Sequence, residues 1–241
     1  MKYIKPLSPR TYKLTRRKVI SDQNRARILL SAKDVLLAPD FREFSMETVA
    51  KAAGVTRLTI YYQFNSRAGL LEALYDFLAR SAHLGERIGE VFRTGNVAQQ
   101  QIHLFIDVFM NFWASNREVI RRLHGLGAID SEIGLGLRAR NERRRNGLRV
   151  LVDDHVRMNY RYTALQIPVM LDILHMITSF ETFDALCVGE RSLEDVRKIL
   201  IRMADQALGM WPPPVHPVVA PIVKDSVKPA RTRRKKRRKR I

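Results

Sequence analysis

Residues 56–62, TRLTIYY, carry side chains suited to binding rather than to covalent chemistry: hydroxyls, a guanidinium and two phenols. Thr56 is a natural helix N-cap, so the pattern places these groups on the first turns of a short helix. Hydroxyl, guanidinium and helix N–H groups are the donors with which proteins hold phosphates and base edges. The segment therefore indicates non-covalent recognition of a polyanion.

Catalytic patterns are absent from the sequence. The six His residues show no HExxH pattern and no paired ligand spacing, and there is one Cys. Asp153, Asp154 and His155 are adjacent, but neighbours on a helix point about 100° apart and do not converge on one ion. We expect no enzyme activity, no metal site and no cofactor.

The helix that begins at Thr56 is the second of two. Ser45 is a second natural N-cap, Gly54 supplies the positive φ that ends a helix, and Gly69 is expected to weaken the helix that follows. A polar second helix after a tight turn is typical of the helix-turn-helix, whose second helix enters the DNA major groove. The apolar positions expected to pack together are Met46, Val49, Ala50, Ala53, Ile60, Tyr61 and Phe64.

From residue 25 to about residue 78 the chain resembles the DNA-binding domain of the TetR family of transcriptional regulators. The matching residues are Ile28, Leu29, Ala32, Ser45, Val49, Ala50, Ala53-Gly54-Val55-Thr56, Thr59-Ile60-Tyr61, Phe64, Ser66, Arg67 and Leu70. The resemblance implies an all-α protein of about nine helices. A three-helix DNA-binding domain would precede a helical bundle that binds an effector and dimerises.

The resemblance and the residue chemistry together predict the DNA contacts. Hydroxyls and helix N-termini would hold phosphates, a guanidinium would reach guanine, and a methyl-bearing side chain would touch thymine. The predicted DNA-binding residues are Ser45, Thr56, Arg57, Leu58, Thr59, Tyr61, Tyr62 and Arg67.

Beyond residue 66, caps and glycines predict a series of helices. We expect helices over 67–83, from Asn96 through Trp113, a short one from Ser115 to Gly125, then 130–160, 163–188 and 192–208. The last two carry more apolar positions than one core requires. They are predicted to form a four-helix homodimer interface, although plain core packing takes part of each helix.

An effector pocket between the helices of the body is implied by the resemblance alone. Its candidate lining residues also fit ordinary core packing. The arginine-rich run over residues 138–149 could indicate an acidic effector, but a run that circles a long helix is interpreted as a solvated face. The candidates are His103, Phe109, Trp113, Met170, His175, Met176 and Phe180.

The net charge of +19 is concentrated at the two ends of the 241-residue chain. Residues 1–20 hold seven Lys or Arg and residues 228–241 hold ten, with no acidic residue in either, which leaves +2 for the remainder. Blocks of like charge are usually disordered interaction tails. The tails either bind a polyanion or only improve solubility, and the C-terminal one could also lie on an anionic membrane.

These observations divide the chain into four parts: a disordered basic arm (1–20), a DNA-binding domain (21–84), a ligand-binding and dimerisation domain (85–211), and a Pro-rich linker with a disordered basic tail (212–241). One Cys, Cys187, fits the reducing cytoplasm, and no apolar run is long enough to span a bilayer. The expected function is that of a dimeric repressor released by a small effector. The alternatives are a tail-driven nucleic-acid or membrane adaptor, and a regulator that answers to a protein partner.

Overall fold

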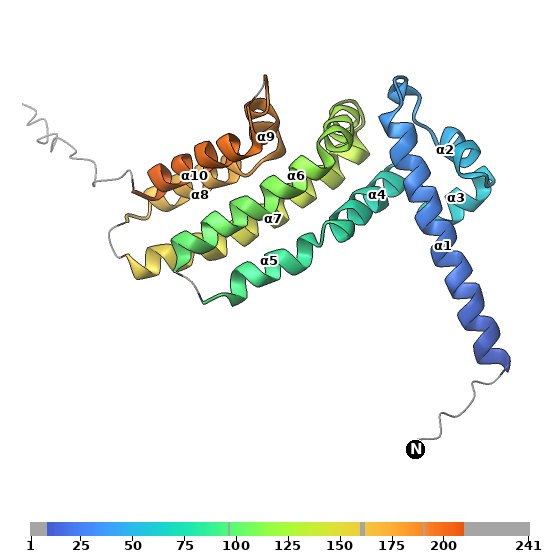
Figure 1. The fold of residues 1–241 in the computed structure, drawn as a ribbon, viewed down its shortest axis with the longest axis horizontal. Coiled ribbons are helices and arrows are strands. Elements are labelled where there is room, and N and C mark those ends of the chain that lie inside the picture. Colours follow the sequence, from blue (N-terminus) through green and yellow to red (C-terminus); the bar gives the residue numbers. More distant parts are fainter. Residues whose placement is uncertain (1–8, 96, 160–161, 190, 210–241) are drawn as a thin grey trace, which may run out of the picture. The chain divides into compact units, whose positions relative to one another are not determined.

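The computed structural model describes residues 9–95, 97–159, 162–189 and 191–209, which belong to the unit Met1–Trp211. Within these residues the fold is all-α, as predicted, with ten α-helices rather than about nine (Figure 1). The elements are α1 (Pro9–Leu37), the 3₁₀-helix η1 (Phe41–Glu43), α2 (Met46–Ala53), α3 (Arg57–Phe64), α4 (Arg67–Ser81), α5 (Leu84–Arg93), α6 (Ala98–Ile129), α7 (Ser131–Met158), α8 (Gln166–Ile177), α9 (Phe180–Leu186) and α10 (Leu193–Gly209).

The predicted caps define α2 and α3. The Ser45 hydroxyl accepts from the backbone N–H of Thr48 at 3.1 Å, and the Thr48 hydroxyl accepts from the backbone N–H of Ser45 at 3.0 Å. Gly54 ends α2 in the left-handed region, with φ +62°. Because these bonds satisfy donors that a helix start leaves free, the α2–α3 boundaries follow from local sequence.

The N-terminal helices share one core. Ile28 of α1, Val49 of α2, Ile60 of α3 and Leu70 of α4 are each fully shielded from solvent. These helices contact one another pairwise, α2 packing on α1 and α3, and α4 packing on α1 and α3. This core fixes the direction in which the polar side of α3 faces.

Gly69 permits the close approach of α3 to α4. A Cβ at this position would lie 2.1 Å from the backbone carbonyl oxygen of Phe64. The Ser66 hydroxyl accepts from the Gly69 N–H at 3.0 Å and caps the same turn. The glycine therefore serves a close contact, which outweighs its low helix propensity.

Helix α1 begins earlier than predicted. We expect a disordered arm up to residue 20, but α1 starts at Pro9. Proline suits the first helical position, and no Gly or Pro follows within the helix, so local propensity favours helix despite the charge. Residues 1–8 lie outside the described part of the chain.

Helix α6 continues through the expected break at Ser115, which corrects the predicted short helix ending at Gly125. The Ser115 hydroxyl donates back to the Asn111 carbonyl at 2.9 Å and caps no new helix. A kink is present instead at Asn116, whose φ and ψ are −128° and 17°. Val97 precedes α6 without a side-chain cap, and Asn96, the predicted cap, lies outside the described residues.

The predicted helix over 163–188 is divided in two, α8 and α9. Thr178 ends α8, and the Ser179 hydroxyl accepts from the Thr182 N–H at 3.1 Å, starting α9. Trp113 of α6 donates from its indole to the Thr178 carbonyl at 3.0 Å. A local serine cap and a tertiary bond to the freed carbonyl together stabilise the break.

The C-terminal helices pack mainly on α6 and α7, which lie side by side (Figure 1). Helix α5 contacts α6, α10 contacts α6 and α8, and α8 also contacts α7. Tilted aromatic pairs join Phe105, Phe109 and Trp113 along α6, and Trp113 meets Phe180 edge-on. In the described part of the chain no helix combines the length and apolarity needed to cross a membrane.

Candidate functional site

One side of α3 is presented to solvent. Leu58 and Tyr61 are each 57% exposed and Tyr62 is 77% exposed, whereas Ile60 is fully buried. We expect Tyr61 to pack against α2, but the structure exposes it. Successive residues of a helix point about 100° apart, so Tyr61 faces water while its neighbour Ile60 faces the core. We call the exposed set Thr56, Arg57, Leu58, Tyr61 and Tyr62 the α3 face.

The hydroxyls at the start of α3 are already engaged within the helix. The Thr56 hydroxyl accepts from the Thr59 N–H at 3.1 Å and lies 2.8 Å from the Thr59 hydroxyl. Thr59 itself is half-buried, and Thr56 is exposed. The cap leaves the other N–H groups of the first turn free to bind an anion.

A surface hollow of about 360 Å³ separates α3 from the starts of α2 and α4. It brings together four of the predicted residues, Ser45, Arg57, Tyr61 and Arg67, while Thr56, Leu58, Thr59 and Tyr62 lie outside its lining. Two guanidiniums, a phenol and the helix N-terminal region of Ser45 thus border one space, together with the carboxylate of Glu47, which leaves the lining with one net positive charge. The arrangement suits a tetrahedral anion such as a backbone phosphate.

Arg67 is engaged inside the chain, which its sequence position does not reveal. Its Nε donates to the Phe44 carbonyl at 3.0 Å and its Nη1 to Asp130 Oδ2 at 3.0 Å. Ser66 beside it donates to Glu132 at 3.1 Å. The start of α4 is therefore held to the α6–α7 junction by two acidic side chains, one of which, Asp130, also caps α7.

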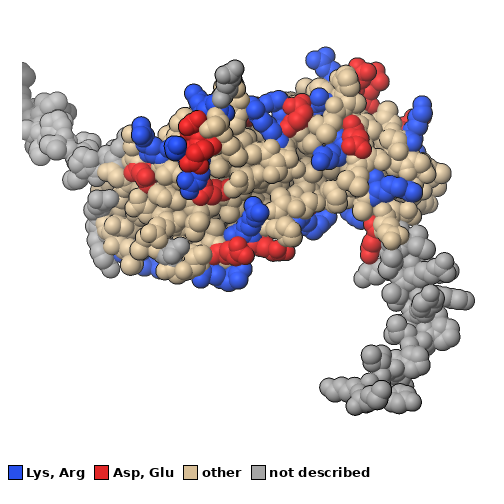
Figure 2. Space-filling view, in the orientation of Figure 1, with Lys and Arg blue, Asp and Glu red and all other residues tan. Residues whose placement is uncertain are grey.

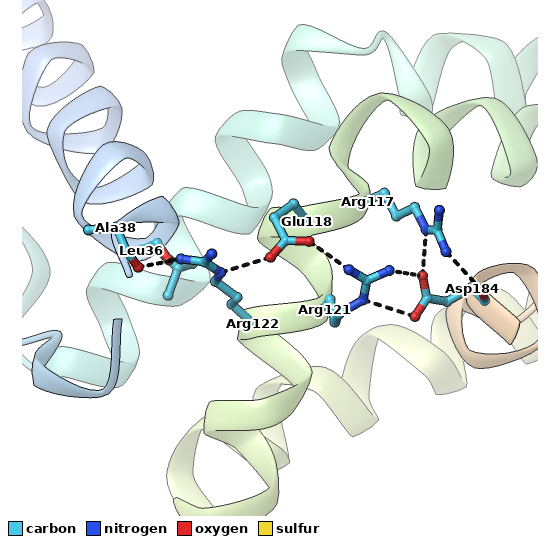
Figure 3. A network of polar contacts seen from close by, with 7 residues as sticks. All are labelled: Leu36, Ala38, Arg117, Glu118, Arg121, Arg122 and Asp184. Carbon is cyan, nitrogen blue, oxygen red and sulfur yellow. Dashed lines mark hydrogen bonds and ion pairs between the residues drawn. The ribbon is translucent and has the colours of Figure 1, made fainter. Parts of the chain in front are cut away.

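A second polar network joins the end of α1 to α6 and α9 (Figure 3). Arg122 donates to the carbonyls of Leu36, at 2.7 Å, and Ala38, and it pairs with Glu118 at 2.9 Å. Glu118 also binds Arg121, which reaches Asp184 on α9. Hydrogen bonds from Arg121 and then Arg117 lower the pKa of Asp184. Sequence patterns gave no signal for this long-range network.

The predicted pocket residues do not line one cavity together, although Phe109, Trp113 and Phe180 pack in one aromatic cluster. His103 pairs with Asp205 at 2.6 Å, Met170 is fully buried and Met176 is 52% exposed. Trp113 and Phe180 pack on each other as core residues. His175 lies 3.0 Å from Arg144, and burial followed by that guanidinium lowers the pKa of His175.

A cavity of about 300 Å³ lies among α4, α5, α6 and α7, and of the predicted residues only Phe109 lines it. We call it the α4–α7 cavity. One part of its wall is apolar, formed by Ala79, Leu84, Ile88, Phe105 and Phe109. The polar part is formed by Tyr75, Asp76, Arg140, Arg143 and Arg144.

The interpretation of residues 138–149 as a solvated face is wrong for one member of the run, Arg144, which is buried. Arg138, Arg143 and Arg149 are exposed, but Arg144 retains 5% of its accessible surface. Consecutive residues on α7 point in different directions, so one of a run of arginines turns inward. Elsewhere on the face drawn in Figure 2, basic and acidic side chains are interspersed.

Among the described residues, no group of three or more His, Cys, Asp or Glu side chains is placed to hold a metal ion. The adjacent residues Asp153, Asp154 and His155 therefore do not form such a group. His155 Nε2 instead lies 2.9 Å from the Tyr162 hydroxyl.

Known proteins similar to this chain are bacterial transcriptional regulators. The profile described as bacterial regulatory proteins, tetR family, matches residues 28–74. The chain is 32% identical over 100 residues to the HTH-type transcriptional regulator EthR of Mycolicibacterium smegmatis, a match that covers 42% of this chain and 46% of that protein. It is 30% identical over 112 residues to the regulator AlkX of Mycobacterium tuberculosis, covering 43% and 48%. The matches thus span about half the length of these curated relatives.

Solved structures share the fold over a larger part of the chain. A transcriptional regulator of the TetR/AcrR family from Thermobifida fusca aligns with a TM-score of 0.57 at 18% identity, over 78% of this chain and 98% of that one. NalD of Pseudomonas aeruginosa, described as the secondary repressor of the MexAB-OprM multidrug efflux pump, also gives 0.57 at 18%, over 78% and 96%. Residues 28–74 thus match the TetR family of bacterial regulatory proteins, and over the rest of the chain the likeness to the solved structures is one of fold.

Proposed function

We propose that this protein is a transcriptional regulator that binds double-stranded DNA through the α3 face. The observation that carries the proposal is the exposure of Leu58, Tyr61 and Tyr62 on a capped helix whose opposite side is fully buried. Large side chains at such exposure are typical of a binding surface. An α-helix of this kind fits the major groove, which is about 12 Å wide.

Each side chain of the α3 face has a proposed role. Arg57 reaches guanine or a phosphate, Leu58 or Thr59 touches a thymine methyl, and Tyr61 and Tyr62 contact the sugar-phosphate backbone. The N-terminal turns capped by Ser45 and Thr56 hold phosphates. Arg67 joins them when a phosphate replaces Asp130 as its partner.

We further propose a homodimer formed by α8 and α10. Val169 is 41% exposed and Met176 is 52% exposed on α8, and Leu193 at the start of α10 is 40% exposed. Ile173 lies between the first two at helical spacing and is partly buried. A two-fold dimer presents its recognition helices about 34–36 Å apart, which requires a roughly palindromic operator.

Repression and release by a small effector complete the proposal. NalD is described as a repressor, and family resemblance supports the same mode here. The α4–α7 cavity supports an effector site because helix α4, which carries Arg67, also supplies Tyr75, Asp76 and Ala79 to the cavity wall.

The test is the affinity of the full chain for DNA flanking its own coding region, compared with a scrambled duplex at near-physiological salt. Tyr62→Ala is expected to weaken binding to both duplexes alike. Arg57→Ala should in addition reduce discrimination by about 1–3 kcal/mol at one base pair. Arg149→Ala, an exposed arginine on α7, is the matched control and should change neither affinity.

The outcomes separate the competing functions. Equal losses on both duplexes for Arg57→Ala would contradict base recognition by that side chain. Removal of residues 224–241 should lower affinity for both duplexes but keep the preference. If the full chain shows no preference and binding disappears with the tail, the tail-driven adaptor is the correct function. Those tail residues lie outside the described structure.

A further inference from the structure

Arg144 is a buried cation without an anionic partner among the residues the structure describes. Its nearest polar contacts are His175 Nε2 at 3.0 Å, Thr178 Oγ1 at 3.4 Å and Asn141 Oδ1 at 3.5 Å, all uncharged or weakly basic groups. Its Nε is fully shielded and donates no hydrogen bond. A buried charge in such surroundings is costly unless it is paired.

The acid that most affects Arg144 is already committed elsewhere. Burial lowers the pKa of Arg144 to about 10, and Glu181 is the largest opposing influence. Glu181 itself lies 2.8 Å from His124 Nδ1, with which it is paired. Arg144 therefore remains protonated at neutral pH without a carboxylate of its own.

The α4–α7 cavity offers a further unpaired donor beside Arg144. Arg140 Nε is buried without a hydrogen-bond partner, and its guanidinium lies 4.7 Å from the ring centre of Tyr75, a residue that is 8% exposed. The one acid in the lining, Asp76, is 2.7 Å from Arg140 Nη2. With Arg143 also at the wall, the polar part of the cavity has an excess of positive charge.

We propose that the α4–α7 cavity binds a small organic carboxylate with an apolar body, and that Arg144 is the group that recognises its charge. This inference rests on the proposed effector function and specifies the chemistry of the effector. The carboxylate would accept from the guanidinium and from the Tyr75 hydroxyl. The apolar body would lie against Leu84, Ile88 and Phe105, where its burial adds affinity.

The size of the cavity limits the ligand. At about 30 Å³ for each water-sized group, a volume of about 300 Å³ holds on the order of ten non-hydrogen atoms. Octanoate has about that many and combines both required chemical features. It is therefore the probe, with 1-octanol as its uncharged counterpart and acetate as the anion without an apolar body.

The experiment is calorimetric titration of the full chain with these three probes. Octanoate is expected to bind at least about tenfold more tightly than octanol, because a hydrogen bond to a charged group contributes at least that factor. Acetate should bind more weakly than octanoate. Arg144→Gln should remove the preference for octanoate, while Arg144→Lys keeps part of it. Arg149→Gln, on the exposed side of the same helix, should leave all affinities unchanged.

Two results would overturn the proposal. One is an octanoate affinity no greater than that of octanol in the wild-type chain. The other is an unchanged octanoate affinity in Arg144→Gln, measured on protein whose thermal melting shows that it is folded. Operator binding without probe is measured in parallel. A chain that binds operator but not octanoate refutes the ligand class alone, and one that binds octanoate but no DNA refutes the proposed function alone.

Discussion

Arg57 and Arg144 show how differently the two parts of this protein hold a positive charge. Arg57 lies in water on the α3 face, where its guanidinium stays hydrated. Arg144 lies among helices with 5% of its surface exposed and without an ion pair in the described chain. An exposed cation therefore favours association from solution, whereas a buried one creates a deficit of negative charge that a specific anion can fill.

The largest effect on the free energy of unfolding is expected when the buried charge of Arg144 is removed. Arg144→Met keeps the length of the side chain and removes the desolvation penalty. The free energy of unfolding, measured by urea denaturation without ligand, should rise by about 1–3 kcal/mol. Arg140→Met is the contrasting variant. It should destabilise the chain, because it leaves Asp76 without its ion-pair partner.

A smaller effect on stability is expected from Glu181, the carboxylate that partly offsets the positive charge of Arg144. The hydrogen bond from His124 lowers the pKa of Glu181 from 4.5 to about 2. Because the folded state holds this proton less tightly than the unfolded state, the contribution is present above pH 4.5 and is lost as the pH falls towards 2. Glu181→Gln should therefore flatten the stability profile between pH 5 and pH 2. The side chain is 62% exposed, so screening keeps the difference below about 1 kcal/mol.

The smallest effect on stability is expected at the α3 face. Arg57→Met should change the free energy of unfolding by no more than about 0.5 kcal/mol, because an exposed side chain without an ion pair in the described structure contributes little. A loss of more than 1 kcal/mol in urea denaturation would contradict the comparison. It would show that Arg57 supports the fold as well as the surface.

Local interactions could be predicted from the sequence. Ser45, Gly54 and Thr56 act within four residues of their own positions, so their types alone predicted both ends of α2 and the start of α3. Ser192 at the start of α10 is another example, since its hydroxyl accepts from the Asp195 N–H at 3.1 Å. Such positions owe their roles to backbone donors that every helix start provides.

Positions that depend on several helices could not be predicted. The arginines of the run on α7 cannot be told apart by sequence. Only the packing of α6 and α8 against α7 decides that Arg144 is the one that points inward. The cavity wall comes from four helices, and most of its residues have no distinguishing type. Likewise, the role of Arg67 depends on Asp130, which is 63 positions away.

The kink at Asn116 divides α6 into two straight halves that a change of bend angle would move relative to each other. The first half of the helix carries Phe105 and Phe109 at the cavity, and the second half ends at Asp130, the partner of Arg67. From Asn116 to Asp130 the helix extends ~21 Å at 1.5 Å per residue. A change of ~5° in the bend angle therefore displaces Asp130 by ~2 Å, a shift of the size seen in helix movements of regulated proteins. Such a displacement is enough to open a 3.0 Å ion pair without any distortion of α3.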